Sequence, residues 1–333
     1  MKRQQAEELL SRFEGKRILV VGDLMADEHI WGHVGRVSPE APVLVIEVER
    51  ETFVPGGAAN VVNQLNALGA QVITAGVVGD DAAGARLREN LGMMGVDTRG
   101  VVTTTDRPTT RKTRVMARSQ QEAQQVVRVD REKRAPLPDT VSAELVARAS
   151  EVLDECDGLL FSDYDKGVLG RRTVAALIAA ARARKQMVVT ANPKPPSVRF
   201  YQDADVITLN KFEADQVSGS TRFEEGGEIP FHAAGTRLRT DLAVRNLIVT
   251  RSALGLTVFR TDGGYEDVPA HRVDVFDGTG AGDSTIAGLT LALSSGASLS
   301  EAVALGNAAG GAVVRKVGVV TASRDEIAAL FSS

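Results

Sequence analysis

Cysteine is almost absent from this sequence, and long apolar runs are absent altogether. The 333 residues include one cysteine, Cys156, which excludes an internal disulfide and is typical of a reducing compartment. We interpret Cys156 as a small core or near-surface residue, because it stands where an expected helix meets an expected strand. No stretch approaches the roughly 18 apolar residues of a membrane span. Residues 1–17 are charged and lack the apolar core of a secretory signal. We therefore expect a cytoplasmic protein with no membrane partner.

A large excess of charge of one sign is also lacking. The sequence holds 39 Lys and Arg against 43 Asp and Glu, a net charge of −4, which argues against a nucleic-acid partner. The motifs GxxxxGK[ST], GxSxG and a strand-linked GxGxxG are missing. Their absence argues against P-loop NTPases, α/β-hydrolases and dinucleotide dehydrogenases. The four histidines form neither HExxH nor a Cys/His cluster, so no zinc site is expected.

What the sequence does contain is an alternation of short apolar runs with amphipathic stretches. This alternation indicates a parallel sheet covered on both faces. Strands are expected at residues 18–22, 72–78, 158–162, 187–191, 206–210 and 247–251. Helices are expected at residues 58–68, 82–94, 139–155 and 171–184, with two more after residue 296. We therefore expect an α/β fold with a mostly parallel central sheet flanked by helices.

Two segments, residues 30–54 and 108–130, break this alternation. Their residues alternate between apolar and polar, as those of antiparallel strands do. We interpret the two segments as a small β-sheet that projects from the main sheet as a lid. The alternative is that they are ordinary edge strands of the main sheet. No repeat or linker divides the chain, so we expect one domain, residues 1–333, that carries this lid.

A glycine-rich turn, DGTGAGD at residues 277–283, runs directly into an apolar helix. Glycines let a backbone approach a ligand closely, and a helix N-terminus offers N–H groups and a partial positive charge. This combination is typical of a phosphate site. Asp283 in the first turn of the helix would either balance the helix dipole or accept the proton of an attacking hydroxyl.

Two elements near the N-terminus carry polar groups that suit a sugar. Gly56 and Gly57 open a helix from which Asn60 projects, and its amide can both donate and accept hydrogen bonds. Asp23 and Asp27 follow the first expected strand, at the sheet edge where doubly wound folds bind ligands. The alternatives are a plain helix cap at the first element and solvated loop carboxylates at the second.

Polar residues also follow the carboxyl ends of three later strands. These ends lie along one edge of a parallel sheet, so the residues together are a stronger indication of a binding site than any one of them alone. They are Asn192 and Lys194, then Asn210 and Glu213, and then Thr250, Ser252 and Gly255.

Two of these elements together resemble the signatures of the ribokinase-like (PfkB) carbohydrate kinase family. GGAAN at 56–60 stands near the start of the chain and GAGD at 280–283 near its end, with NxxE at 210–213 between them. The resemblance implies the ribokinase-like fold and an ATP-dependent sugar kinase. The sequence is more similar still to the kinases of heptose 7-phosphate, through PGGAANV, FSDYDKGVL and GNAAGGAVV. No HxGH-type nucleotidyltransferase motif is present, so we expect the stand-alone form.

The resemblance implies a role for each matching residue. Asp283 would be the catalytic base, beside an anion hole formed by N–H groups of Gly280, Ala281 and Gly282. The sugar would be held by Asp23, Asp27, Gly56, Gly57 and Asn60. Its existing phosphate would be held by Lys112, Arg114 and Arg128, unless these lid residues form a solvated face. ATP and Mg²⁺ would be bound by Asn192, Lys194, Asn210, Glu213, Thr250, Ser252, Gly255, Gly280, Gly282 and Asn307. The carboxylates nearest the metal would be Glu213 and Asp277, and family members often bind K⁺ near the glycine-rich turn.

Four features depart from the pattern of the relatives. Gly278 replaces a larger residue after Asp277, Val62 replaces a small one, and Asn192 replaces the usual Asp of the heptose kinases. Residues 120–125 lengthen a lid strand by about four residues relative to that pattern.

The resemblance therefore implies phosphoryl transfer from ATP to the anomeric 1-hydroxyl of D-glycero-D-manno-heptose 7-phosphate, with a homodimer formed through the lid. Two alternatives stay open. One is another kinase of this fold, acting on a sugar, a phosphosugar or a nucleoside. The other is a catalytically silent sensor of a sugar or nucleotide.

Overall fold

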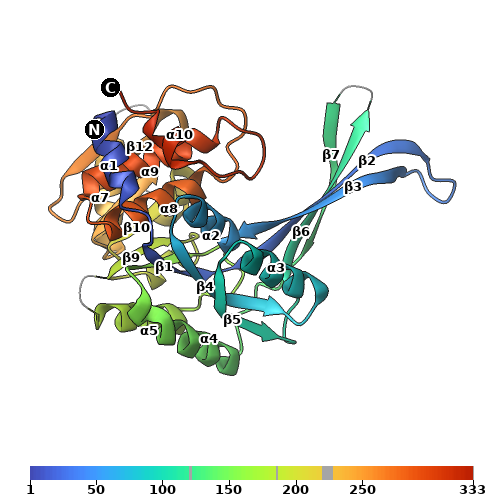
Figure 1. Ribbon diagram of the computed structural model, residues 1–333, viewed down its shortest axis with the longest axis horizontal. Coiled ribbons are helices and arrows are strands. Elements are labelled where there is room, and N and C mark those ends of the chain that lie inside the picture. The colour runs from blue at the N-terminus through green and yellow to red at the C-terminus, as the bar shows by residue number, and fades with distance from the viewer. Residues whose placement is uncertain (120–121, 185–186, 220–227, 333) are drawn as a thin grey trace.

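A large and a small β-sheet organise the chain, and helices cover only the large one (Figure 1). The computed structural model describes residues 1–119, 122–184, 187–219 and 228–332. Among these residues, no helix is both long and apolar enough to cross a bilayer.

The large sheet has nine strands within the described residues and is parallel except at one edge, where β12 runs antiparallel to both of its neighbours, β11 and β13. Their spatial order is β13 (Tyr265–Val268), β12 (Leu256–Phe259), β11 (Asn246–Thr250), β10 (Val206–Asn210), β9 (Val188–Asn192), β8 (Gly158–Ser162), β1 (Arg17–Gly22), β4 (Gln71–Gly79) and β5 (Asp97–Thr104). The expected mostly parallel sheet is confirmed. The sequence analysis missed β5, β12 and β13.

Helices pack on both faces of the large sheet. On one face lie α1 (Arg3–Ser11), α2 (Ala58–Ala67), α3 (Ala82–Met93), α8 (Ala281–Ser294), α9 (Leu299–Val313) and α10 (Arg324–Ala328). On the other lie α4 (Asp139–Val152), α5 (Arg171–Arg182), α6 (Lys211–Ser218) and α7 (Glu228–Asp241). Short 3-10 turns at Leu153–Glu155, Val198–Phe200 and Ser252–Leu254 complete the helical elements.

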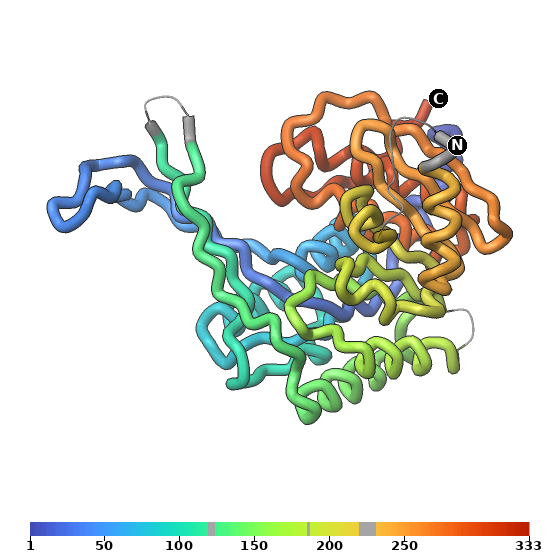
Figure 2. Tube along the Cα trace, turned by 180° about the vertical axis from the view of Figure 1, so that it is seen from behind, coloured from blue at the N-terminus to red at the C-terminus, as the bar shows by residue number. Residues whose placement is uncertain are grey.

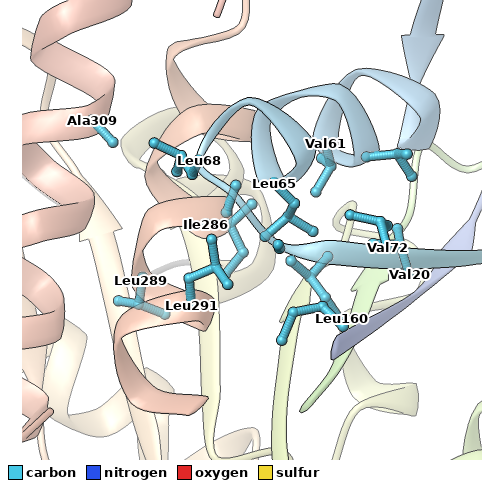
Figure 3. Packing of buried hydrophobic residues seen from close by; sticks show 14 of the residues in the cluster. Val20, Val61, Leu65, Leu68, Val72, Leu160, Ile286, Leu289, Leu291 and Ala309 are labelled. Carbon is cyan, nitrogen blue, oxygen red and sulfur yellow. The ribbon is translucent and has the colours of Figure 1, made fainter. Parts of the chain in front are cut away.

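Strand β1 shows why the sheet is covered on both sides. Ile18 and Val20 point into the core beneath α2 and α8, whereas Leu19 and Val21 point into the core beneath α4 and α5. All four side chains are fully buried, so a near-continuous apolar run is what a central parallel strand requires. Figure 3 shows the first of these cores, where side chains of α2 and α8 meet those of the strands.

The small sheet consists of β2 (Leu24–Val37), β3 (Leu44–Gly57), β6 (Thr110–Ser119) and β7 (Glu122–Arg131), in the spatial order β3-β2-β6-β7. Its β2–β3 and β6–β7 pairs are antiparallel, whereas β2 and β6 pair in parallel. Figure 2 shows this sheet extending away from the body of the molecule. These strands do not pair with the large sheet, so the alternative of ordinary edge strands is wrong.

Candidate active site

A pocket of about 180 Å³ opens at the carboxyl edge of the large sheet. It lies where the ends of β9, β10 and β11 meet the N-terminus of α8, as expected for a parallel sheet. Its walls are formed by Tyr164, Asn192, Lys194, Thr208, Leu209, Asn210, Glu213, Thr250, Gly280, Gly282, Asp283 and Thr285. The structure therefore brings residues from three strand ends and the glycine-rich turn into one cavity.

The glycine-rich turn is folded by its first carboxylate, that of Asp277. One carboxylate oxygen accepts hydrogen bonds from the N–H of Thr279 at 2.9 Å and from its hydroxyl at 2.7 Å. The other oxygen accepts from the N–H of Gly318 at 2.9 Å. The hydrogen bonds from Thr279 lower the pKa of Asp277. This carboxylate is thus committed to the turn, and it does not line the pocket expected to hold the metal.

Gly280 is the residue that turns the chain into α8. Its φ of 80° lies in the left-handed region that favours glycine. The residues that follow place the first turn of α8 against the pocket, where the N–H groups of a helix start offer an anion site. Gly278 is different, because an added Cβ there would meet nothing within 4 Å. The larger residue that relatives carry at this position would therefore meet no neighbouring atom at its Cβ.

Asp283 lies in the first turn of α8 and is 8 % exposed. Its two oxygens have different partners: the Asn60 amide donates to Oδ2 at 2.6 Å, and the Tyr164 hydroxyl donates to Oδ1 at 2.5 Å. Burial raises the pKa of Asp283, whereas these two hydrogen bonds and nearby Lys194 lower it. The carboxylate is oriented from both sides and borders the pocket, as a general base must.

Lys194 and Glu213 form an ion pair across the pocket, with 2.5 Å between Nζ and Oε1. Glu213 also belongs to a capping box with Asn210, in which each side chain binds the other residue's backbone N–H. Asn192 donates from its amide to the carbonyl and hydroxyl oxygens of Thr208, both at 3.0 Å. Neighbouring strand ends are thereby tied together beneath the cavity.

The residues expected around the nucleotide divide into two groups. Thr250 lines the pocket. Ser252 and Gly255 lie beyond it in a tight turn with φ values of 52° and 89°, and Asn307 on α9 donates to the carbonyl of Pro269 at 2.8 Å. These three residues lie outside the lining of the pocket.

Asp23 has backbone partners instead of an open face toward the pocket. Its carboxylate accepts from the N–H groups of Tyr164 at 2.7 Å, Lys166 at 3.2 Å and Val168 at 3.4 Å. Burial, followed by repulsion from Asp163, raises the pKa of Asp23 to about 7. The Asp23 carboxylate therefore binds the segment after β8, and Asp23 does not line the pocket.

Asp27 lies where the small sheet leaves the body of the molecule. Arg114 approaches it to 2.6 Å, and Lys112 stands opposite it in register on β6. Burial lowers the pKa of Lys112, and the nearby charge of Asp27 raises it in part. Gly56 makes room for this carboxylate, since an added Cβ would stand 2.1 Å from Asp27 Oδ2.

Two other expected residues have roles that the sequence did not show. Gly57 caps α2 with a φ of 57°, and an added Cβ would meet the carbonyl of Asp23 at 2.6 Å. Arg128 pairs with Asp130 of its own strand at 2.8 and 3.0 Å and is half exposed. Arg128 stands opposite Arg114 in register on β7, but its guanidinium is paired with Asp130.

Two of the departures from the family pattern concern the core and the lid. Val62 is buried in the core. The lengthened segment at 120–125 includes residues 120–121, which lie outside the described residues.

Tyr164 was missed by the sequence analysis. It follows β8 by two residues, in the same relation to a strand end as the polar residues that were chosen. The rule applied to β9, β10 and β11 would have found it had β8 been included.

The comparisons with known proteins identify the family of the chain. The sequence matches the description "pfkB family carbohydrate kinase" over residues 16–326. The chain belongs to the pfkB carbohydrate kinase family. Its members transfer a phosphoryl group to a sugar hydroxyl, so the chain is a carbohydrate kinase.

Curated relatives include the bifunctional protein HldE of Geobacter metallireducens, 42% identical over 327 residues, and that of Helicobacter hepaticus, 40% identical over 311. The alignments cover 98% and 93% of this chain, but 65% and 63% of those proteins. The chain therefore spans less than two thirds of the length of these relatives.

Solved structures show the same fold at low identity. Phosphofructokinase-2 of Escherichia coli in complex with potassium superposes with a TM-score of 0.75 at 19% identity, covering 95% of this chain and 98% of that one. Arabidopsis thaliana ribokinase complexed with ribose and ATP gives 0.72 at 18% identity, covering 95% and 99%. The ribokinase-like fold expected from the sequence is confirmed.

Proposed function

We propose that this kinase transfers the terminal phosphoryl group of ATP to the anomeric 1-hydroxyl of D-glycero-D-manno-heptose 7-phosphate. The observation that carries the choice of a phosphorylated sugar is the pair Lys112 and Arg114 beside Asp27. A neutral sugar has no use for two half-buried cations next to a carboxylate, whereas a phosphate matches the guanidinium geometry. The similarity to heptose 7-phosphate kinases, in PGGAANV and FSDYDKGVL, supports the heptose.

The chemical step follows from the surroundings of Asp283. The sugar hydroxyl attacks the γ-phosphorus of ATP, Asp283 accepts the hydroxyl proton, and the bond to the β-phosphate oxygen breaks to release ADP. The N–H groups of Gly280, Ala281 and Gly282 at the start of α8 stabilise the charge on the transferred phosphoryl group. Positioning and electrostatics supply most of the acceleration in such a reaction.

On the nucleotide side, Lys194 approaches the ATP phosphates, with Asn192, Asn210 and Thr250 around it. Ser252, Gly255 and Asn307 lie further out and contact the rest of the nucleotide. On the sugar side, Asp27 and Gly57 are the groups that we assign to the sugar hydroxyls. Asn60 contributes there through the orientation that it gives Asp283.

Glu213 is the carboxylate that suits Mg²⁺ in this pocket. Among the described residues no group of three or more His, Cys, Asp or Glu could hold a metal ion. That finding fits Mg²⁺, which is usually bound by one or two carboxylates together with substrate phosphates. Mg²⁺ supplies neutralisation of phosphate charge when bound. K⁺ near the glycine-rich turn is the monovalent cation that we propose, and a potassium complex of phosphofructokinase-2 supports it.

The small sheet is the surface through which we propose that the chain forms a homodimer. Large apolar side chains are exposed on it by between 41 and 60 %. They are Val37, Val43, Leu44, Val48, Val126, Val127 and Val129. Exposed apolar side chains near both edges of a projecting sheet favour a protein partner, because burial against a partner removes them from water. Sedimentation of the intact chain at several concentrations measures the dimer directly, and a monomer throughout would contradict it.

A panel of acceptors tests the proposed function. Heptose 7-phosphate, heptose, fructose 6-phosphate, fructose, ribose and adenosine are each offered with ATP and Mg²⁺, and ADP release is measured. We expect the highest kcat/KM with heptose 7-phosphate. Faster turnover of a sugar without phosphate would overturn the substrate assignment and leave another sugar kinase of this fold. A catalytically silent sensor would release no ADP with any acceptor in the panel.

A further inference from the structure

A short segment after β8, residues 163–168, connects a buried carboxylate to the proposed base. At one end, the Asp23 carboxylate binds the backbone N–H groups of Tyr164, Lys166 and Val168. At the other, the Tyr164 hydroxyl donates to Asp283 Oδ1 at 2.5 Å. Asp23 is 1 % exposed, so its contacts with the segment are shielded from water.

We propose that Tyr164 is a positioning residue for phosphoryl transfer, which fixes the Asp283 carboxylate through its hydroxyl while Asp23 holds the Tyr164 backbone. The inference rests on the proposed role of Asp283 as the base. It is independent of which sugar the enzyme uses.

The geometry separates Tyr164 from an ordinary buried tyrosine. A buried hydroxyl needs some partner, but this one shares its partner with the Asn60 amide, which binds the other oxygen of Asp283. One donor on each oxygen fixes the rotation of the carboxylate, just as a catalytic base elsewhere is oriented by a third group. Tyr164 is itself held in place, because the Lys194 ammonium lies 5.3 Å from the centre of its ring.

The hydrogen bond also affects the charge state of the base. The Tyr164 hydroxyl donates to the ionised carboxylate and so lowers the pKa of Asp283, against the effect of burial. The other groups facing this site are Asn60 and Lys194, which also lower that pKa, and Asp27, which raises it. Burial, followed by the charges of Asp283, Asp27 and Glu213, raises the pKa of the Tyr164 phenol well above its usual value, so the phenol stays neutral.

The test is Tyr164→Phe, measured with whichever acceptor the wild-type chain turns over fastest in the panel of sugars. We expect kcat to fall about tenfold, as loss of a hydrogen bond to a charged group predicts, with the KM for ATP unchanged. The acid limb of the kcat/KM profile against pH should move to higher pH, because Asp283 then binds its proton more tightly. The position of this limb does not depend on how much of the variant is folded.

Tyr201→Phe is the matched control. The Tyr201 hydroxyl also donates to a buried carboxylate, that of Asp163 at 2.7 Å, but not to the base. This variant should keep the acid limb at its wild-type position. A Tyr164→Phe limb that stays in place, or that moves equally in Tyr201→Phe, would overturn the positioning role. Failure of wild type to use heptose 7-phosphate would instead overturn the substrate assignment, and the two failures are therefore distinguishable.

Discussion

The carboxyl edge of the large sheet and the base of the small sheet both place charged groups near the proposed sugar site, but they hold them differently. At the large sheet, Asp283 is 8 % exposed and has a donor on each oxygen. At the small sheet, Arg114 keeps a quarter of its side chain exposed and has one close carboxylate partner, Asp27. Groups fixed by several long-range contacts suit chemistry, whereas groups on a projecting sheet suit the choice of substrate. The comparison predicts that substitutions in the two regions change different kinetic constants.

The largest effect is expected from Asp283→Asn at the large sheet. An amide cannot accept the hydroxyl proton, so kcat should fall by at least about 100-fold, while ATP binding measured by calorimetry is retained. Asp277→Asn, at the other end of the same turn, is the control and should lose far less, because that carboxylate braces the turn. Near-normal turnover in Asp283→Asn would remove Asp283 from the chemical step.

The next effect concerns the backbone that presents the base. Gly280→Ala places a side chain at φ 80° and 3.2 Å from the Asn60 amide, which costs about 1–2 kcal/mol in backbone strain. We expect kcat to fall about tenfold or more. Gly278→Ala in the same turn meets nothing within 4 Å and should keep wild-type kcat. An equal fall in kcat in the two variants would show that the left-handed conformation of Gly280 is not what kcat depends on.

The small sheet is tested by Arg114→Gln. Loss of one cationic contact to a phosphate should raise the KM for the phosphosugar about tenfold, with little change in kcat or in the KM for ATP. The control is Arg118→Gln, an exposed residue four positions further along β6, which should change either constant about twofold at most. A fall in kcat alone for Arg114→Gln would contradict the assignment of substrate binding to the small sheet and of the chemical step to the large sheet.

The smallest effect is a pH dependence of stability that arises from Asp23. Its pKa is raised from 3.8 to about 7, so between these values the folded chain keeps a proton that the unfolded chain has released. Stability contributed by this group therefore falls as pH rises through that window. The melting temperature of wild type, relative to Asp23→Asn, should drop by a few degrees from pH 5 to pH 7.5. Parallel melting curves across that range would contradict the raised pKa.

Much of the large sheet followed from the sequence because its strands are near-continuous apolar runs. β1 can be recognised without knowledge of its partners, because a short apolar run between amphipathic helices is typical of a strand buried on both faces. β12 and β13 were missed because β12 has only four residues and β13 carries charged Glu266 and Asp267. Such short antiparallel strands are specified by their neighbours more than by their own pattern.

The site was predictable where a residue type and its position after a strand were sufficient, as at Lys194 and Glu213. The site was not predictable where the role of a residue depends on which distant residue it contacts in the fold. Asp23 and Asp27 look alike in the sequence, but one binds three backbone N–H groups and the other an arginine. Likewise, nothing local in FSDYDKGVL indicates that Tyr164 reaches a residue 119 positions away.

The contact between Asn60 and Asp283 joins residues 223 positions apart in the chain. During synthesis, a nascent chain can complete β1, β4 and α2 long before α8 leaves the ribosome. Asp283, the proposed base, receives the hydrogen bond from Asn60 only when α8 docks against α2. A product that stalls before α8 therefore lacks the proposed base, and we expect it to transfer no phosphate from ATP.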